Sequence, residues 1–178
     1  VAGVALLLQT STRIVCVNLQ RNFLEGLGAT IVSAALKSNA TLKGLDLSRN
    51  GIGDEGAIAV GNALRVNDSL TDISLASNQI ADEGGSAIAY ALHTNRAIRR
   101  LGLSRNSLGP RTASAFTRAL RHNCCLESLD LCNNALCDDG AAAIADGLVG
   151  NNHLMTVNLS GNSIKCHGIE LLAGGLKQ

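Results

Sequence analysis

Apolar and polar positions alternate in a short phrase that returns along the whole chain. The first clear copy begins at Ile14 and closes on Asn22, and later copies begin at residues 42, 70, 98, 126 and 154. Every step is 28 residues, and no insertion or deletion interrupts the series. Alternation with a period of two is typical of a strand that is buried on one face. A fixed period of this length predicts a repeat architecture, in which equivalent strands pair side by side in a parallel sheet.

The second half of each unit has the spacing of a helix. Apolar or small residues recur three and four positions apart, as in Ala57, Val60, Gly61 and Leu64, which is typical of a helix that packs one face on a core. We therefore predict strands that start near residues 16, 44, 72, 100, 128 and 156, and helices near residues 28–37, 56–65 and at the same interval beyond. The strand residues expected to be buried are Leu47, Leu75, Leu103 and Leu131.

Polar residues also recur at fixed places in the unit. An asparagine closes each phrase, at residues 22, 50, 78, 106, 134 and 162. Its amide can satisfy backbone groups that are left unpaired where the chain turns away from the sheet, so we predict a structural ladder. Acidic residues such as Asp54 and Glu55 open the predicted helices, where they can cap them and complement their dipoles. Asparagines at 39, 67, 95, 123 and 151 are expected to end the helices in the left-handed conformation.

The chain is predicted to form one domain over residues 1–178. Residues 1–13 match the helical end of a truncated repeat, full repeats begin at 14, 42, 70, 98 and 126, and the last repeat covers 154–178. Neither Val1 nor Gln178 belongs to a polar capping unit, which solenoids usually need. We therefore expect a fragment of a longer protein, with exposed apolar surface at both ends. Such surfaces predict self-association through the ends, or stabilisation by further repeats.

Composition narrows the class of protein. Apolar residues make up 46% of the chain but aromatic residues only 2%, so Leu, Ile, Val and Ala must fill the interior. The formal net charge of +1 gives no general reason to expect nucleic acid or an anionic membrane as a partner. The six cysteines follow neither the repeat period nor a paired spacing, which is typical of reduced thiols. We predict a cytoplasmic protein, with the nucleus as the alternative.

Motifs of catalysis and cofactor binding are missing from the sequence. There is no phosphate-binding G-x-x-x-x-G-K-[ST], no G-x-S-x-G and no H-E-x-x-H. We therefore predict no enzymatic activity, no cofactor and no metal. Cys124, Cys125, Cys132 and Cys137 cluster without C-x-x-C spacing, which makes a zinc site the weaker alternative. Cys137 and Cys166 lie one residue off the repeat phase in adjacent units, and we expect free thiols there rather than a disulfide.

The repeat phrase resembles that of a known family. The pattern L-x-x-L-x-L-x-x-N occurs at Leu42–Asn50, I-G-D-E-G-A follows at Ile52–Ala57, and a helical half completes the 28-residue unit. This combination is similar to the ribonuclease-inhibitor class of leucine-rich repeats, which includes ribonuclease inhibitor, the GTPase-activating protein of Ran and the ligand-sensing regions of NOD-like receptors. The resemblance covers essentially all of residues 1–178. It implies an α/β right-handed solenoid or horseshoe, with a parallel sheet on the concave face and helices on the convex face.

The variable positions around the strand leucines predict the contact surface. Side chains between the leucines, such as Asp46 and Asp130, are expected to point away from the core onto the concave sheet. The positions just before and after them are rich in cations. The candidate partner-binding residues are Arg21, Lys43, Asp46, Arg49, Arg99, Arg105 and Asp130. Strands about 4.8 Å apart would make Arg21 and Arg49 neighbours of like charge, which favours an acidic or phosphorylated protein partner. The alternative is a solvated face whose charges only maintain solubility.

These features together predict a protein-interaction scaffold, the repeat region of a larger intracellular sensor or regulator. The alternative is a GTPase-activating or other regulatory subunit, which would contact the switch regions of a GTPase with a loop at the strand exits. The near-neutral charge and the single Tyr argue against a role like that of the acidic, aromatic-rich ribonuclease inhibitor. The family resemblance is specific for the fold and much less so for the function.

Overall fold

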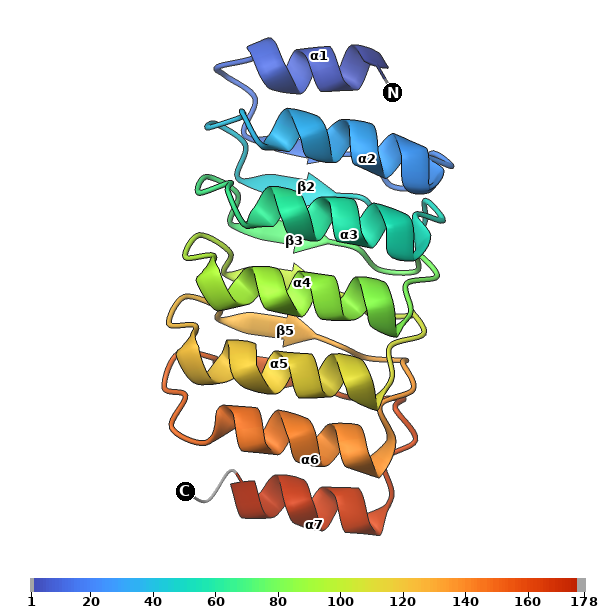
Figure 1. The fold of residues 1–178 in the computed structure, drawn as a ribbon, viewed down its shortest axis with the longest axis vertical. Coiled ribbons are helices and arrows are strands. Elements are labelled where there is room, and N and C mark those ends of the chain that lie inside the picture. The colour runs from blue at the N-terminus through green and yellow to red at the C-terminus, as the bar shows by residue number, and fades with distance from the viewer. Residues whose placement is uncertain (1, 176–178) are drawn as a thin grey trace.

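Strands and helices alternate along residues 2–175, which are the residues that the computed structural model describes (Figure 1). The strands are β1 Cys16–Asn18, β2 Gly44–Asp46, β3 Asp72–Ser74, β4 Arg100–Gly102, β5 Ser128–Asp130 and β6 Thr156–Asn158. The helices are α1 Ala2–Thr10, α2 Glu25–Leu36, α3 Gly53–Leu64, α4 Asp82–Thr94, α5 Pro110–His122, α6 Cys137–Leu148 and α7 Cys166–Gly175. The predicted strand positions and the alternation of the two element types are confirmed.

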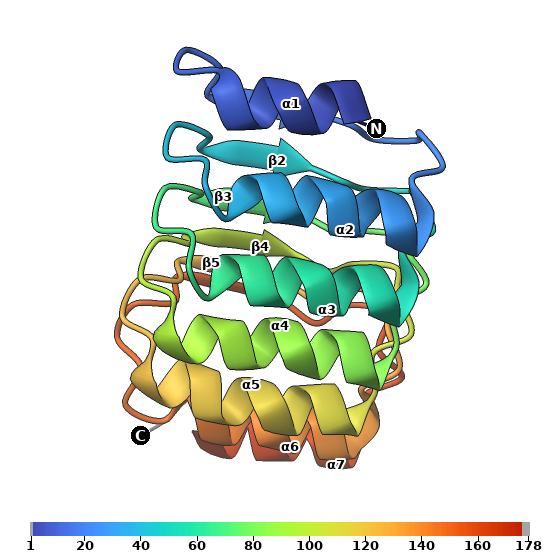
Figure 2. The same cartoon turned by 45° about the horizontal axis from the view of Figure 1, so that its top comes forward.

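The strands form one parallel sheet in chain order, from β1 to β6. Each strand pairs with the next in a register that equals the sequence period, so that Cys16 lies beside Gly44 and Gly44 beside Asp72. The helices lie in one layer over a single face of the sheet, and Figures 1 and 2 show this layer in front of the strands. This is the predicted α/β solenoid, and its uncovered sheet face is available to solvent.

The core lies between the sheet and the helix layer. Leu47, Leu75, Leu103 and Leu131 have no exposed surface, as predicted. Helix side chains such as Val60 pack against them from the other side. Small residues let the helices approach closely, because a Cβ at Gly61 would lie 2.9 Å from the carbonyl oxygen of Ala87 in the next helix. Neighbouring repeats therefore share one continuous core, and no repeat buries its apolar face alone.

The predicted asparagine ladder is confirmed, and Asn50 shows how it works. The side-chain nitrogen of Asn50 donates to the carbonyl oxygens of Leu47 in its own repeat and Leu19 in the preceding one, at 2.8 and 2.9 Å. Its side-chain oxygen accepts hydrogen bonds from the backbone N–H groups of Asn22 and Leu24, at 2.8 and 3.4 Å. One buried amide thus bonds to backbone groups of two adjacent turns, and the side chains of Asn22 and Asn78 donate to the same carbonyl oxygens of Leu19 and Leu47.

The second asparagine column does not act as predicted. Asn95 and Asn123 follow the ends of α4 and α5 with φ values of −68° and −82°, so they are extended and not left-handed. Their side chains instead bond to the neighbouring repeat, as Asn95 does when its side-chain nitrogen donates to the carbonyl oxygens of Leu64 and Asn67, at 2.7 and 2.9 Å. This is a second ladder, which satisfies the last carbonyl groups of the preceding helix.

The acidic residues cap helices, but not their own. The side chain of Asp82 lies in the first turn of α4 and accepts hydrogen bonds from the backbone N–H groups of Gly109 and Thr112, at 2.9 Å each, and from the Thr112 hydroxyl at 2.7 Å. Asp54 bonds in the same way to the start of α4. The helices begin about three residues before the predicted positions, which places each Asp inside its helix and beside the start of the next one.

The cap also selects the conformation of the turn that follows it. Where an Asp precedes by 27 residues, as for Ala81 and Gly109, the residue is extended and donates its N–H to that Asp. Where Gly26 and Pro110 stand in place of the Asp, the corresponding Gly53 and Cys137 have φ values of 57° and 55°. The N–H groups of these two residues donate forward, to the carbonyl oxygens of Asn78 and Asn162. The acid in one repeat therefore determines the backbone of the next.

Replacing Asp82 with Ala is expected to destabilise the protein by about 1–2 kcal/mol at neutral pH, the usual cost of losing a helix cap. Burial raises the pKa of Asp82, but its bonds to Thr112 and Gly109 and the nearby Arg111 outweigh this and lower the pKa overall. A lowered folded-state pKa means that the stabilisation is fully present above the unfolded pKa of about 3.9 and is lost as pH falls through the folded value.

Urea unfolding measured at several pH values tests this prediction. The difference between wild type and Asp82→Ala should shrink as the solution is acidified. The control is Asp139→Ala, because Asp139 is exposed in the first turn of α6 and its side chain makes no hydrogen bond within residues 2–175. A pH-independent difference, or an equal loss in the control, would contradict the assigned cap.

Exposed apolar side chains occur near both ends of the described chain, as predicted. Leu6 and Leu7 on α1 and Ile169 and Leu171 on α7 are between 38% and 61% exposed. Val1 and Gln178 themselves lie outside the described residues. Self-association through these surfaces stays a prediction.

Candidate functional site

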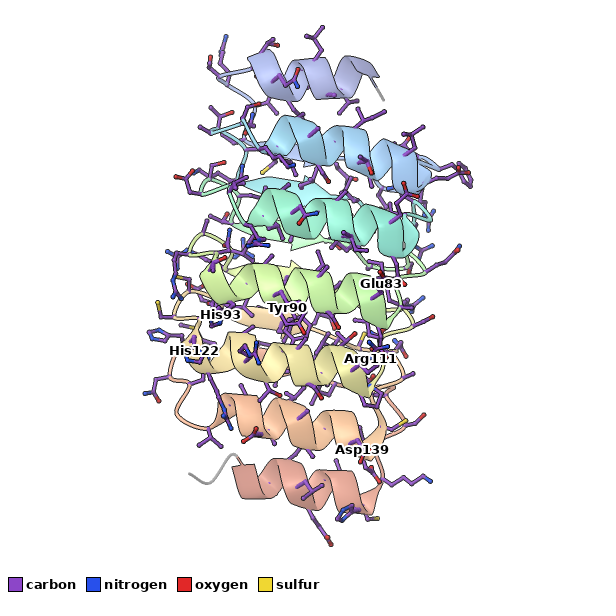
Figure 3. The ribbon with its side chains drawn as sticks, viewed as in Figure 1. Glu83, Tyr90, His93, Arg111, His122 and Asp139 are labelled. Atoms are coloured by element: carbon purple, nitrogen blue, oxygen red, sulfur yellow. The ribbon has the colours of Figure 1, made fainter. Side chains whose placement is uncertain are left out.

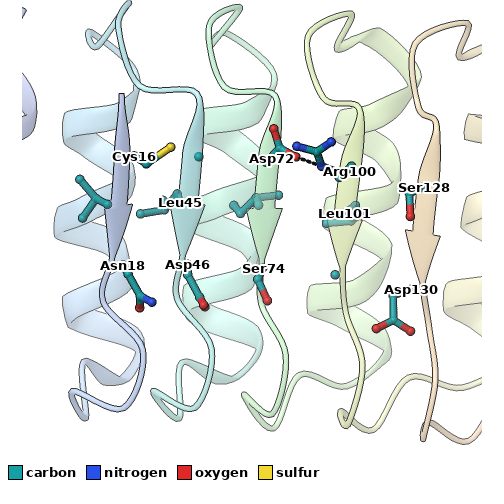
Figure 4. A pocket seen from close by; sticks show the side chains of 14 residues that line it. Cys16, Asn18, Leu45, Asp46, Asp72, Ser74, Arg100, Leu101, Ser128 and Asp130 are labelled. Atoms are coloured by element: carbon teal, nitrogen blue, oxygen red, sulfur yellow. Dashed lines mark ion pairs between the residues drawn. The ribbon is translucent and has the colours of Figure 1, made fainter. Parts of the chain in front are cut away.

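The uncovered face of the sheet holds a groove of about 550 Å³, which we call the sheet groove (Figure 4). It runs across β1 to β5. The first and last residues of these strands line it, together with the apolar middle residues of β1 to β4. The lining residues are Cys16, Val17, Asn18, Gly44, Leu45, Asp46, Asp72, Ile73, Ser74, Arg100, Leu101, Gly102, Ser128 and Asp130. The groove thus has an apolar floor and two polar margins.

The depth of the groove follows from small residues on the outward strand positions. Gly44 and Gly102 carry no side chain, and Ser74 and Ser128 carry short ones. A partner could therefore reach the floor of the groove between these small residues. Leu45 on that floor is only 3% exposed, because its side chain enters the core. A column of larger residues at these positions would fill the groove.

Carboxylates dominate the charge of the sheet groove. Asp72 and Arg100 form an ion pair between β3 and β4. Asp46 and Asp130 each use one oxygen to accept a backbone N–H, from Ser48 at 2.8 Å and from Cys132 at 3.0 Å. Within residues 2–175 the other oxygen of each carboxylate accepts no hydrogen bond. Three acids and one cation leave the groove net negative, so hydrogen-bond donors and cations are the groups that it favours.

The candidate residues are divided among three places. Asp46 and Asp130 lie in the sheet groove, on the face that the sequence predicts. Lys43 and Arg99 come directly before β2 and β4, at the ends where the strands begin. The Arg99 guanidinium pairs with Glu127 at 2.6 Å, and both groups are partly exposed, so the pair contributes little to stability.

The other three cations are not on strands, which corrects the prediction. Arg21, Arg49 and Arg105 have φ values of 61°, 58° and 55°, in bends that follow β1, β2 and β4. The reason is the asparagine ladder, since the chain must leave the sheet before the ladder residue, and Arg49 directly precedes Asn50. The predicted cationic surface is therefore two rows at opposite ends of the strands, with an acidic groove between them.

Sequence reasoning missed the glycines that deepen the groove and the ion pair of Asp72 with Arg100. A signal for the groove was present, because Gly44 and Gly102 interrupt strand positions where larger polar residues are common in the other repeats. The ion pair had a signal as well, because residues 72 and 100 are one 28-residue period apart and the register therefore places Asp72 beside Arg100.

The sulfur and imidazole groups form no further site in the described chain. All six cysteines are free thiols, and Cys124 and Cys125 have their sulfurs 3.9 Å apart. Burial and the neighbouring Cys124 thiol raise the pKa of Cys125, so it is a poor nucleophile. The rings of His93 and His122 lie edge to face, with centroids 5.0 Å apart (Figure 3).

The described residues contain neither a metal-binding cluster nor a membrane-spanning helix. Within residues 2–175 no three His, Cys, Asp or Glu side chains are arranged to hold a metal ion. Among the described helices, each is too short or too polar to cross a membrane.

Comparison with solved structures finds the same fold at low sequence identity. The structure of leiomodin-1 actin-binding site 2 superposes with a TM-score of 0.61 and 19% identity, over 97% of this chain and 87% of that one. The C-terminal domain of tropomodulin from Caenorhabditis elegans gives a TM-score of 0.62 and 14% identity, over 98% of this chain and 90% of that one. No curated protein sequence gives a significant match.

A family model places the repeats in a known class. The model described as "Leucine Rich repeat" matches residues 38–61, 66–89, 122–145 and 150–173, which together make up more than half of the chain. The matched segments recur at the period of the sheet register, and the strands and ladder asparagines agree with the repeat phrase. The chain belongs to the leucine-rich repeat family.

Proposed function

We propose that this protein is a non-enzymatic interaction scaffold, which binds an extended segment of a partner protein in the sheet groove. The observation that carries the proposal is the groove itself, which is open along its length and crosses five strands. Strands about 4.8 Å apart make its span about 19 Å, which matches roughly six extended residues. A small-molecule site would instead be expected to enclose most of its ligand.

The chemistry of the groove indicates what such a segment carries. The floor at Leu45, Ile73 and Leu101 offers little side-chain contact, because these residues are only 2–3% exposed. The free oxygens of Asp46 and Asp130 suit backbone or side-chain donors. A basic residue opposite these carboxylates would add a charge-assisted hydrogen bond. The acidic character predicted for the partner then applies only to the parts of it that reach the cationic rows outside the groove.

Two further parts of the proposal concern the setting of the domain. We propose that it is the repeat region of a larger intracellular sensor or regulator, with the cytoplasm as its location. The leiomodin-1 structure of the same fold is described as an actin-binding site, which supports protein binding by this architecture. Assays of GTP hydrolysis with a panel of small GTPases separate the scaffold from the alternative of a GTPase-activating subunit.

Filling the groove tests the proposed function. Peptides of twelve residues, selected from a displayed library on the wild-type chain, should bind with a dissociation constant on the order of micromolar. Gly102→Tyr should weaken their binding at least about tenfold, because the new ring occupies the groove; tenfold corresponds to about 1.4 kcal/mol. A Cβ at Gly102 would lie 3.3 Å from the Ser74 hydroxyl, a tight contact that a small shift of this side chain relieves.

The matched control is Ser114→Tyr, which adds the same ring to an exposed position on α5. It should leave peptide affinity unchanged. Equal affinity of both variants and wild type, in proteins with unchanged circular dichroism, would contradict binding in the groove.

A further inference from the structure

Phe23 stands out because its ring is almost entirely in solvent. It is 87% exposed, although the chain has only two phenylalanines and the other, Phe116, has no exposed surface. The equivalent positions of the other repeats are small or polar: Gly51, Gln79, Ser107, Ala135 and Ser163. The repeat architecture therefore does not require an aromatic residue at this place.

The backbone around Phe23 takes the left-handed conformation that recurs at this turn of the repeat, and a phenylalanine is an unusual residue for it. Arg21, Phe23 and Glu25 have φ values of 61°, 50° and 54°, in the left-handed region that bulky side chains rarely adopt. Asn50 holds this segment in place, because its side-chain oxygen accepts the N–H of Leu24 and its backbone oxygen accepts the N–H of Glu25. The ring is thus presented by a pinned turn, at a left-handed position that Gly51, Gln79 and Ser163 occupy in other repeats and that suits a bulky side chain poorly.

Phe23 borders a hollow of about 600 Å³ at the ends of the first three strands. Arg49, Gly51, Ser77 and Gln79 line the same hollow, and Glu25 stands on its rim beside Phe23. Within residues 2–175 Arg49 forms no ion pair. The hollow therefore offers an aromatic face, an unpaired guanidinium and a carboxylate close together, at one edge of the sheet.

We infer that Phe23 and Arg49 form an anchor for a partner segment in which an apolar side chain stands next to a carboxylate. The inference rests on the proposed function and adds a second contact to the sheet groove. Aromatic residues, phenylalanine included, and arginines are enriched in the buried cores of protein interfaces. An apolar partner side chain would cover the exposed ring, and a carboxylate would pair with the Arg49 guanidinium in a two-bond arrangement. Glu25 repels a second carboxylate, which sets the orientation of the segment.

The variant Phe23→Gly separates a binding role from a structural one. Glycine fits the backbone, since Gly51 has a φ of 64° at the same place in the next repeat. A residue that serves binding at the expense of stability should give a higher melting temperature when it is replaced, together with at least a tenfold loss of peptide affinity. A residue that packs the fold should give a lower melting temperature.

Ser163→Gly is the matched control, because Ser163 has a φ of 57° at the equivalent position but no ring. It should raise the melting temperature and leave peptide affinity unchanged. Peptides selected from the displayed library should contain Asp or Glu beside an apolar residue. Arg49→Gln should weaken the binding of these peptides at least fivefold.

Three results would overturn the inference. The first is unchanged affinity of Phe23→Gly for peptides that Gly102→Tyr no longer binds, which leaves the proposed function intact. The second is a lower melting temperature of Phe23→Gly. The third is a wild-type dimer in sedimentation that becomes a monomer in Phe23→Gly. A second copy of the chain would then be what covers the ring. If neither Phe23→Gly nor Gly102→Tyr changes the affinity for the peptides, the proposed function is contradicted as well.

Discussion

Replacement of Asn50 with Ala is expected to lower the free energy of unfolding by about 3–4 kcal/mol, a loss of the size expected when a buried polar network is broken. Asn50 is 2% exposed, and its amide bonds to backbone groups of its own repeat and of the preceding one. Alanine leaves the N–H groups of Asn22 and Leu24 without their acceptor, while the carbonyl oxygens of Leu19 and Leu47 each lose one of two side-chain donors. Each buried group left unpaired costs about 1–3 kcal/mol before any relaxation.

Chemical denaturation followed by circular dichroism measures this loss. Asn62→Ala is the control, because Asn62 is exposed on α3 and its side chain makes no hydrogen bond within residues 2–175. Asn50→Asp is a finer variant, since it keeps the shape but replaces the donating nitrogen with an oxygen that faces the carbonyls of Leu19 and Leu47. A loss of less than about 1 kcal/mol for both Asn50 variants would show that the ladder is not what holds the turns.

Replacement of Phe116 with Ala is expected to cost about 3–5 kcal/mol, because it removes the largest fully buried side chain and leaves a cavity. Phe116 lies on the core side of α5, at the repeat position that Val60, Ile88 and Ile144 occupy in other units. Phe116→Ile should therefore cost much less, about 1–2 kcal/mol, since an isoleucine fits this position in two other repeats.

The two phenylalanines provide an internal comparison for this prediction. Phe23→Ala deletes the same atoms from an exposed position and should change stability by less than about 0.5 kcal/mol. Melting temperatures and urea midpoints of the three variants test the prediction. Similar losses for Phe116→Ala and Phe23→Ala would mean that burial does not control the effect.

The strand register could be predicted with certainty from the sequence because of its period. When every repeat has the same length, each residue of one strand can only lie beside its equivalent in the next, as Cys16 lies beside Gly44. The buried leucines follow from the same fact, since a slip of one residue would turn all of them to solvent. The ladder role of Asn50 was also predictable, because a turn away from a buried sheet leaves backbone groups that need a polar partner.

The capping residues show where reasoning within one repeat fails. Asp82 has the residue type and the position expected of a cap for its own helix, α4. Its carboxylate nevertheless accepts hydrogen bonds from Gly109 and Thr112 at the start of the next helix. Asn95 likewise bonds to the end of the preceding helix and does not adopt the left-handed conformation. In both cases the partner lies in another repeat, which a local pattern does not specify.

For the candidate site, the sequence by itself determined which face of the sheet is uncovered and that Asp46 and Asp130 lie on it. Alternation along a strand is enough for this, because successive side chains point to opposite faces. Only the tertiary structure decided where the cations go. Arg49 is three residues beyond β2 and looks like a strand residue by periodicity, but the bonds of Asn50 to the adjacent repeat pull the chain into a left-handed bend before it. Contacts between repeats, and not the pattern within one, therefore place the arginines at the edge beside Phe23 and leave the carboxylates in the groove.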